Sequence, residues 1–336
     1  MMRRGSFAEV FRIPLALLAV ALTSCTTTPP ATGGLSGEVV YTKNDQIYTF
    51  SIGSREERKL VELPAGAVAK DPVWSPDGQR VVFAMYPAPQ RGVPPGTDLM
   101  SVKRDGTDLT VLRKHELAGE MLETPFFLPD GSGIVFGRFA PIVTNGQYTG
   151  DVIEIVRLDF SSGRTTQLVR EAIQPTVAPD GKKIAYIKLN QQTAAQSLMM
   201  ANLDGSNPQQ LVGEDQFSAM FWPRISPNGA EVAYSGALIA SAGQPGGRPA
   251  LRPSGELARP SFHGLPTDVY RVKTDGSKFV QVAKLQEDDP TPLWSVDGQR
   301  LLVIGAKAIY AMNPDGQNQT RVREPGGVGG GDWRGK

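Results

Sequence analysis

Carboxylates recur in the short polar segments that separate the apolar runs of this chain. Six of them stand out by their position: Asp71, Glu123, Glu171, Asp215, Asp288 and Asp289. Carboxylates gathered on one surface attract cations and basic peptides. Two of them held about 5 to 10 Å apart could instead act as the acid and nucleophile of a glycosidase. They could equally serve only to keep exposed segments soluble.

A second group of side chains is of the kind that anchors a protein partner. Segment 217–222 combines Phe217, Phe221 and Trp222 with a methionine, and aromatic and Met side chains on a loop are typical of contact anchors. The same side chains could instead fill a gap between neighbouring structural elements. A Pro/Gly-rich stretch farther along forms a weakly basic arm, which we expect to order on binding. The basic residues of this arm are Arg248, Arg252, Arg259 and His263.

Features of a catalytic or cofactor site are sparse. The two histidines, His115 and His263, lack ligand-like spacing and are expected at the surface. There is no Gly-x-Ser-x-Gly elbow, no Gly-rich phosphate loop, and a single cysteine, Cys25. We therefore predict no catalytic residue, no metal ligand and no cofactor, with a channel-bound Ca²⁺ as the open alternative.

The elements that must position these residues are repeats. Five segments open with a proline and an apolar residue and end in a turn with Gly, beginning at Pro72, Pro125, Pro175, Pro223 and Pro292. A second element, an apolar pair leading into a polar turn with Gly, recurs six times, beginning at Ile47, Leu99, Ile153, Leu198, Val269 and Ile309. A period of roughly 40 to 50 residues built from short strands and tight turns is typical of a propeller.

The turns predict how the strands connect. In Pro76-Asp77-Gly78, Pro and Asp suit the central positions of a type I turn and Gly takes the following positive φ, which joins strands one and two of a blade. The second turn joins strands three and four, so the sequence predicts an all-β, six-bladed propeller of four-stranded blades. Blade one begins at 37–41 without an opening strand. We expect the C-terminal segment around Trp333 to supply its innermost strand, which removes exposed sheet edges.

The N-terminus has the pattern of a targeting segment. Residues 1–24 combine Arg3 and Arg4 with a short apolar run, too short to span a bilayer, and predict a signal peptide. Leu22-Thr23-Ser24-Cys25 resembles the bacterial lipobox, whose cysteine is lipidated; an ordinary secretory peptide with an incidental cysteine is the alternative. We predict that residues 25–35 are the lipidated Cys and a flexible tether, and that residues 36–336 form the propeller. The 35 basic and 34 acidic residues give no support to nucleic-acid binding.

The Ser-Pro-Asp-Gly turns, the Pro-x-Trp elements and the later Ile-Tyr…Asp-Gly elements resemble the propeller repeats of TolB, the periplasmic partner of the Tol–Pal envelope system. The resemblance covers about residues 36–335 and implies the fold much more than the function. It departs from TolB in the tether that replaces an α/β domain and in the lipobox, so binding to Pal does not follow from it.

In a propeller, the loops between strands two and three and the links between blades share one face. The longest of these loops are expected at 86–98, 139–151 and 236–268, and the six carboxylates fall in links around the channel on that face. We therefore predict a monomeric, lipid-anchored protein of the cell envelope, on the extracytoplasmic side of a bacterial membrane. It would bind an envelope protein or peptide, or a glycan, there. The alternatives are a propeller enzyme acting on glycans or lactones, and a purely structural envelope component.

Overall fold

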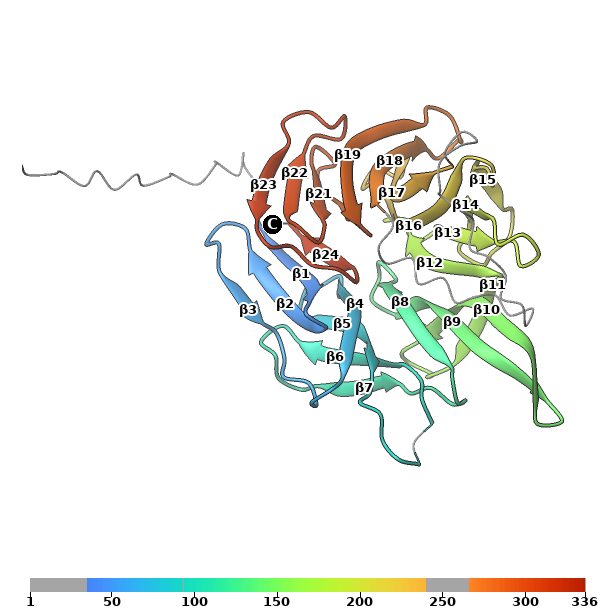
Figure 1. The fold of residues 1–336 in the computed structure, drawn as a ribbon. Coiled ribbons are helices and arrows are strands. Elements are labelled where there is room, and N and C mark those ends of the chain that lie inside the picture. Colours follow the sequence, from blue (N-terminus) through green and yellow to red (C-terminus); the bar gives the residue numbers. More distant parts are fainter. Residues whose placement is uncertain (1–34, 93, 240–265, 336) are drawn as a thin grey trace, which may run out of the picture. The chain divides into compact units, whose positions relative to one another are not determined.

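The computed structural model describes residues 35–92, 94–239 and 266–335, and within them the chain is an all-β ring of six four-stranded antiparallel blades (Figure 1). Blades one to three comprise β24 (Gly331–Arg334), β1 (Glu38–Lys43), β2 (Gln46–Ser51) and β3 (Glu57–Lys59); β4 (Val68–Trp74), β5 (Arg80–Tyr86), β6 (Asp98–Lys103) and β7 (Thr110–Arg113); β8 (Met121–Phe127), β9 (Gly133–Thr144), β10 (Gln147–Asp159) and β11 (Thr165–Arg170). Blades four to six comprise β12 (Ala172–Val177), β13 (Lys183–Leu189), β14 (Gln196–Asn202) and β15 (Gln209–Val212); β16 (Phe217–Ile225), β17 (Glu231–Leu238), β18 (Pro266–Lys273) and β19 (Val280–Asp288); β20 (Thr291–Trp294), β21 (Leu301–Ile304), β22 (Ile309–Met312) and β23 (Thr320–Arg323).

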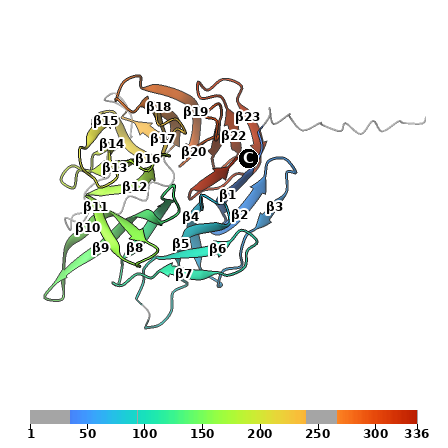
Figure 2. The same cartoon turned by 180° about the vertical axis from the view of Figure 1, so that it is seen from behind.

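One strand of each blade lies at the centre of the ring (Figure 1). These inner strands are β24, β4, β8, β12, β16 and β20. The reverse view shows the same arrangement and labels β20 (Figure 2). The described part of the chain contains no helix of the length and apolar character needed to cross a bilayer. The predicted fold class is therefore confirmed.

The predicted closure of blade one is also confirmed. The C-terminal strand β24 pairs antiparallel with β1, with Trp333 opposite Val39. The indole N–H of Trp333 donates to the backbone oxygen of Ser36 at 3.1 Å. The sheet of blade one thus combines the two ends of the described chain and has four strands, as the other five blades have.

The two kinds of turn lie where the repeats predicted them. Between β4 and β5, the N–H of Gly78 donates to the Ser75 carbonyl at 2.7 Å, and Gly78 takes φ of 64°. Between β6 and β7, Gly106 closes the corresponding turn onto Lys103. We call the face that carries these turns the hairpin face. The opposite face, with the two–three loops and the blade links, is the loop face.

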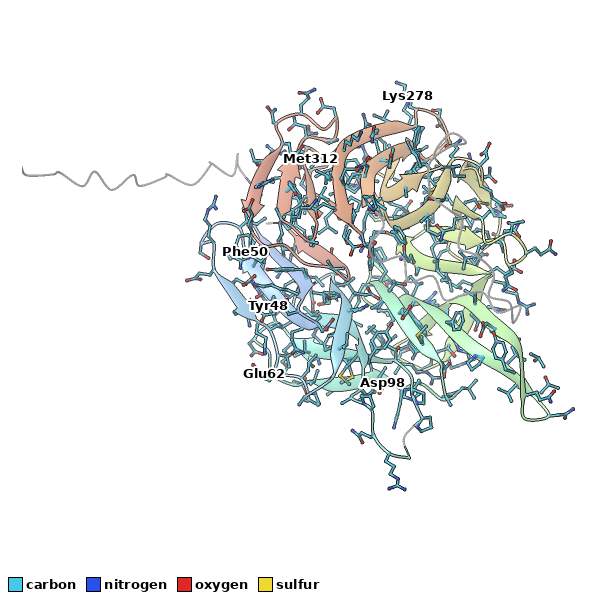
Figure 3. The ribbon with its side chains drawn as sticks, viewed as in Figure 1. Tyr48, Phe50, Glu62, Asp98, Lys278 and Met312 are labelled. Atoms are coloured by element: carbon cyan, nitrogen blue, oxygen red, sulfur yellow. The ribbon has the colours of Figure 1, made fainter. Side chains whose placement is uncertain are left out.

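Six apolar clusters lie between neighbouring blades in the described residues. Because each blade packs on both sides, its middle strands are buried on both faces; Val81 to Ala84 of β5 are almost fully covered. Figure 3 shows side chains filling these spaces, with Phe50 buried in blade one, Met312 buried in blade six and Lys278 at the outer edge of the ring. The inter-blade cores hold the central strands, and so the channel they surround, in place.

Candidate functional site

The inner strands of four blades carry a bulge at the same point. Asp71, Thr124, Gln174 and Trp222 each precede a proline and each take φ between 50° and 59°. The pairing register of β4, β8, β12 and β16 shifts at these positions. A left-handed backbone at a residue with a side chain costs of order 1–3 kcal/mol and is concentrated at functional sites. The bulges place all four side chains on the wall of the central channel.

These residues help line a cavity of about 390 Å³, which we call the channel-mouth cavity. Its wall residues are Lys70, Asp71, Tyr86, Met121, Glu123, Thr124, Gly137, Arg138, Phe139, Ile153, Ile173, Gln174, Leu189, Phe221, Trp222, Asp289 and Gly329. Tyr86 and Leu189 are the last residues of β5 and β13, where those strands lead into two–three loops. The cavity therefore opens on the loop face, the face predicted from the sequence. It combines apolar side chains with three carboxylates.

Two of these carboxyl groups titrate far from their ordinary range. Burial, and after it the nearby Glu123 carboxylate, raise the pKa of Asp71 to about 7. The backbone N–H of Thr124 donates to Asp71 Oδ2 at 2.9 Å and opposes this rise. Burial also raises the pKa of Asp289 to about 7, with Asp288 as a second cause. The indole N–H of Trp222 donates to Asp289 Oδ1 at 2.6 Å and opposes the rise. Negative charge is costly here, so the cavity favours a proton or another cation.

The two cationic side chains of the cavity wall, Arg138 and Lys70, have different partners. Arg138 donates to Glu120 at 2.6 Å and to Glu154 at 2.7 Å, which commits its guanidinium to carboxylates outside the cavity wall. Lys70 Nζ stands 5.9 Å from the centre of the Tyr86 ring and holds down the pKa of both Asp71 and Asp289. The hydroxyl of Tyr86 donates to Glu123.

Of the six predicted carboxylates, the channel-mouth cavity brings three together: Asp71, Glu123 and Asp289. Asp71 and Glu123 belong to inner strands, not to links. The other three lie elsewhere. Glu171 pairs with Lys188 at 2.9 Å, Asp215 is exposed in the link before β16, and Asp288 lines a separate cavity of about 420 Å³.

Segment 217–222 is not a loop, and this expectation was wrong: it forms the first part of the inner strand β16. Phe217 is 1% exposed and packs edge-on against Tyr270 with ring centres 4.9 Å apart, so it fills the gap between elements, the alternative that the sequence left open. Phe221 and Trp222 are also largely buried, at 3% and 4%, but they line the channel-mouth cavity. They are available to a ligand that enters the cavity and not to one that docks on a flat surface.

His115 was expected at the surface and is buried instead. Its Nδ1 lies 2.6 Å from Asp98 Oδ1 and its Nε2 lies 3.2 Å from the Pro94 carbonyl oxygen. The described residues contain no group of three or more His, Cys, Asp or Glu side chains arranged to hold a metal ion. The other predicted contact residues, Arg248, Arg252, Arg259 and His263, lie outside the described residues, as does the predicted lipidation site Cys25.

One predicted loop is a β-hairpin, with one register shift between Tyr148 and Gly150. Residues 139–151 extend β9 and β10 beyond the other strands, with pairing that continues to Thr144 and Gln147. The Asn145-Gly146 turn has positive φ at both residues, and Asn-Gly is the strongest short-range hairpin signal, which the sequence analysis missed. The hairpin projects from the ring in Figure 1.

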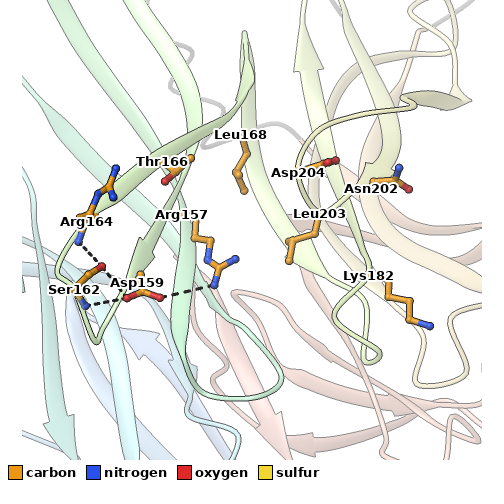
Figure 4. Close-up of a pocket in the computed structure, with 10 residues that line it drawn as sticks. All are labelled: Arg157, Asp159, Ser162, Arg164, Thr166, Leu168, Lys182, Asn202, Leu203 and Asp204. Carbon is orange, nitrogen blue, oxygen red and sulfur yellow. Dashed lines mark hydrogen bonds and ion pairs between the residues drawn. The ribbon is translucent and has the colours of Figure 1, made fainter.

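A larger cavity of about 660 Å³ lies on the hairpin face between blades three and four (Figure 4). Its charged side chains have both signs, and Arg157 lies 3.9 Å from Asp159. None of the residues predicted for a site lines it. Its three basic and two acidic side chains are exposed or only half-buried, so it is the weaker candidate.

Comparisons with known proteins agree on the fold. No protein-family model and no curated protein matches the chain. Among solved structures, TolB from Acinetobacter baumannii matches with a TM-score of 0.62 at 16% identity, over 90% of this chain and 67% of that one. A putative TolB from Agrobacterium tumefaciens gives 0.59 at 16% identity, over 88% and 92%. An oligogalacturonate lyase in complex with manganese gives 0.52 at 15% identity, over 83% and 70%. The described chain thus has a six-bladed propeller fold similar to that of TolB.

Proposed function

We propose that this protein is a binding or scaffold lipoprotein of the bacterial cell envelope, which engages a protein or peptide through the loop face. The observation that carries the proposal is the channel-mouth cavity. It joins apolar walls to three carboxylates at the face where the long loops emerge. Apolar and aromatic walls with a few convergent polar groups are the usual composition of a binding site. The likeness to TolB in fold supports the same direction.

The anchoring part of the proposal comes from the sequence. Lipid on Cys25 would hold the propeller at the extracytoplasmic side of a membrane, and the tether would let the loop face reach a partner. The propeller itself need not touch the bilayer.

A pull-down from detergent-solubilised envelopes tests the binding role. The bait is the full chain, compared with a variant lacking residues 240–262 and with Leu189→Trp, which fills the rim of the channel-mouth cavity. The matched control is Leu203→Trp, because Leu203 is also half-buried but lines the cavity of the hairpin face. We expect a specific protein to be retained by the full chain and the control and lost with the other two variants. Loss with Leu203→Trp alone, or no retained protein, would contradict the proposal.

The second candidate function is a propeller enzyme. Two carboxyl groups with a pKa of about 7 in one cavity fit general acid–base work near neutral pH, and one structural neighbour is a lyase of oligogalacturonate. Incubating the full chain with oligogalacturonides, other glycans and lactones tests it. Turnover that is lost in both Asp71→Asn and Asp289→Asn would move the assignment to an enzyme.

A further inference from the structure

The charges that line the channel-mouth cavity are unbalanced. Asp71, Glu123 and Asp289 come from two inner strands and the link before β20, and all three line one space. The cations of the wall are Lys70 and Arg138, and Arg138 is engaged by Glu120 and Glu154; the buried Arg224, outside the wall, is shared between Asp332 and Asp71. When all three carboxylates are ionised, the wall carries more negative than positive charge. A cationic ligand would relieve this excess.

Each of the three carboxylates uses one oxygen inside the protein. Asp71 accepts from Thr124 through Oδ2, Asp289 accepts from Trp222 through Oδ1, and Glu123 accepts from Tyr86. No donor among the described residues reaches the second oxygen of any of them. Asp71 and Asp289 are each only 7% exposed, yet their second oxygens are not among the polar atoms sealed in the interior without a partner. Two largely buried side chains therefore present an unused acceptor to the cavity.

The walls around these acceptors are apolar and aromatic. Ile153, Ile173, Leu189 and Phe139 line the cavity beside the carboxylates, and Trp222 offers an indole ring. Burying each methylene of an alkyl chain contributes about 0.8 kcal/mol, and a cation over an indole face is stabilised by roughly 0.5–2 kcal/mol. The cavity thus suits a ligand that is apolar along its length and positively charged at its tip.

The arrangement of the carboxylate oxygens favours some kinds of cationic ligand over others. A guanidinium binds best through both oxygens of one carboxylate, and here each carboxylate has one oxygen occupied. A quaternary ammonium has no N–H to donate to the acceptors. A metal ion needs a closed set of ligands, which the described residues do not form. A primary ammonium needs no closed set of ligands, because its three N–H donors can be divided between single acceptors of separate carboxylates and water.

We propose that the channel-mouth cavity binds a primary ammonium on an alkyl stem, namely a lysine side chain of the partner. This assignment rests on the proposed function for its source, but the cavity chemistry can be tested without the partner.

The test is ¹⁹F NMR of the full chain in detergent micelles, labelled with 5-fluorotryptophan. The chain has four tryptophans, and Trp222→Phe assigns the resonance that belongs to the cavity. The probe is Nα-acetyl-lysine N-methylamide, compared with its norleucine and arginine counterparts. We expect the lysine probe to shift the Trp222 signal saturably with a Kd of about 1 mM, and the other two to bind at least about ten-fold more weakly.

Variants show whether the carboxylates cause the selectivity. Glu123→Gln and Asp71→Asn keep an acceptor for Tyr86 and Thr124 but remove charge, and each should weaken lysine binding at least about five-fold. Glu171→Gln, a loop-face carboxylate outside the cavity wall, should leave it unchanged; unaltered signals of Trp74, Trp294 and Trp333 show that each variant is folded.

Equal binding of the norleucine and lysine probes, no saturable shift, or unchanged affinity in both cavity variants would overturn the assignment. A partner retained in the pull-down without lysine selectivity would refute only this inference. Lysine selectivity without any partner would refute the proposed function, and with it the source of the lysine, but would support the preference of the cavity for an alkyl ammonium.

Discussion

Two buried carboxyl groups, Asp71 and Asp289, make the stability of the ring depend on pH. Folding raises the pKa of each from 3.8 to about 7. The folded state therefore binds protons more tightly than the unfolded state between these values. The stabilisation that results is complete below pH 3.8 and is lost as the pH rises through about 7. The two carboxyl groups therefore lower the stability of the folded ring at neutral pH, which fits a role in binding a ligand and not in stabilising the fold.

Asp289→Asn is expected to flatten this dependence. The amide can still accept the hydrogen bond from the Trp222 indole but carries no titratable group. The decline in unfolding free energy between pH 5 and pH 8 should shrink by about 1–3 kcal/mol. Urea unfolding at the two pH values measures it, with Glu171→Gln as the control because Glu171 lies outside the cavity. An unchanged pH slope in Asp289→Asn would show that this carboxyl is not the source.

His115 ties the two–three loop of blade two to the following link. Asp98 Oδ1 accepts from both its backbone N–H and Nδ1, and Gly96 packs so closely that a Cβ there would lie 2.3 Å from the imidazole. We expect His115→Leu to lower the urea midpoint by the equivalent of about 1–3 kcal/mol, because a buried carboxylate loses a donor. Cleavage within 87–97 by a protease should become faster. Lys114→Leu, at an exposed neighbour, should change neither result.

At the scale of the elements, β24 closes the ring. Trp333 is buried in the cluster formed by blades six and one, where it packs with Leu293 and Leu302. Removing its indole leaves a cavity at the point where the ring joins, and large-to-small changes of this kind cost about 3–5 kcal/mol. Trp333→Ala should therefore lower the unfolding free energy by that amount in urea. Val143→Ala, on an exposed strand tip, should change it little; a similar loss in both would contradict the closure role.

The elements that could be predicted from sequence are those whose signals are local. Pro76 fixes its own φ and Gly78 permits a positive φ two residues later, so the turn follows from three adjacent residues. The bulges were not predicted, although the proline after Asp71, Thr124, Gln174 and Trp222 was visible. A proline restricts the residue before it but does not say that its side chain will point into a channel. That outcome depends on five other blades.

The whole ring decides which carboxylates belong to the cavity. Asp71, Glu123 and Asp289 are far apart in the chain and meet only because the blades close around one axis. Glu171 and Asp215 have the same chemistry and follow the same kind of pattern, yet one pairs with Lys188 and the other is exposed. The repeat pattern thus predicted the fold. Which carboxylates line the cavity could be decided only from the structure, because it depends on how the blades lie relative to one another.

The final prediction concerns where the whole molecule works. If Cys25 carries lipid, the propeller is held to a membrane by its N-terminus alone, because a diacylated chain end anchors stably where a single acyl chain does not. Cys25→Ser should then move the protein from the membrane fraction to the soluble extracytoplasmic fraction. Fractionation followed by immunoblotting measures this. The untouched propeller should still retain its partner in a pull-down. Retention of Cys25→Ser in the membrane fraction would mean that the propeller or its partner provides the attachment. The loop face would then bind at the membrane surface instead of reaching away from it.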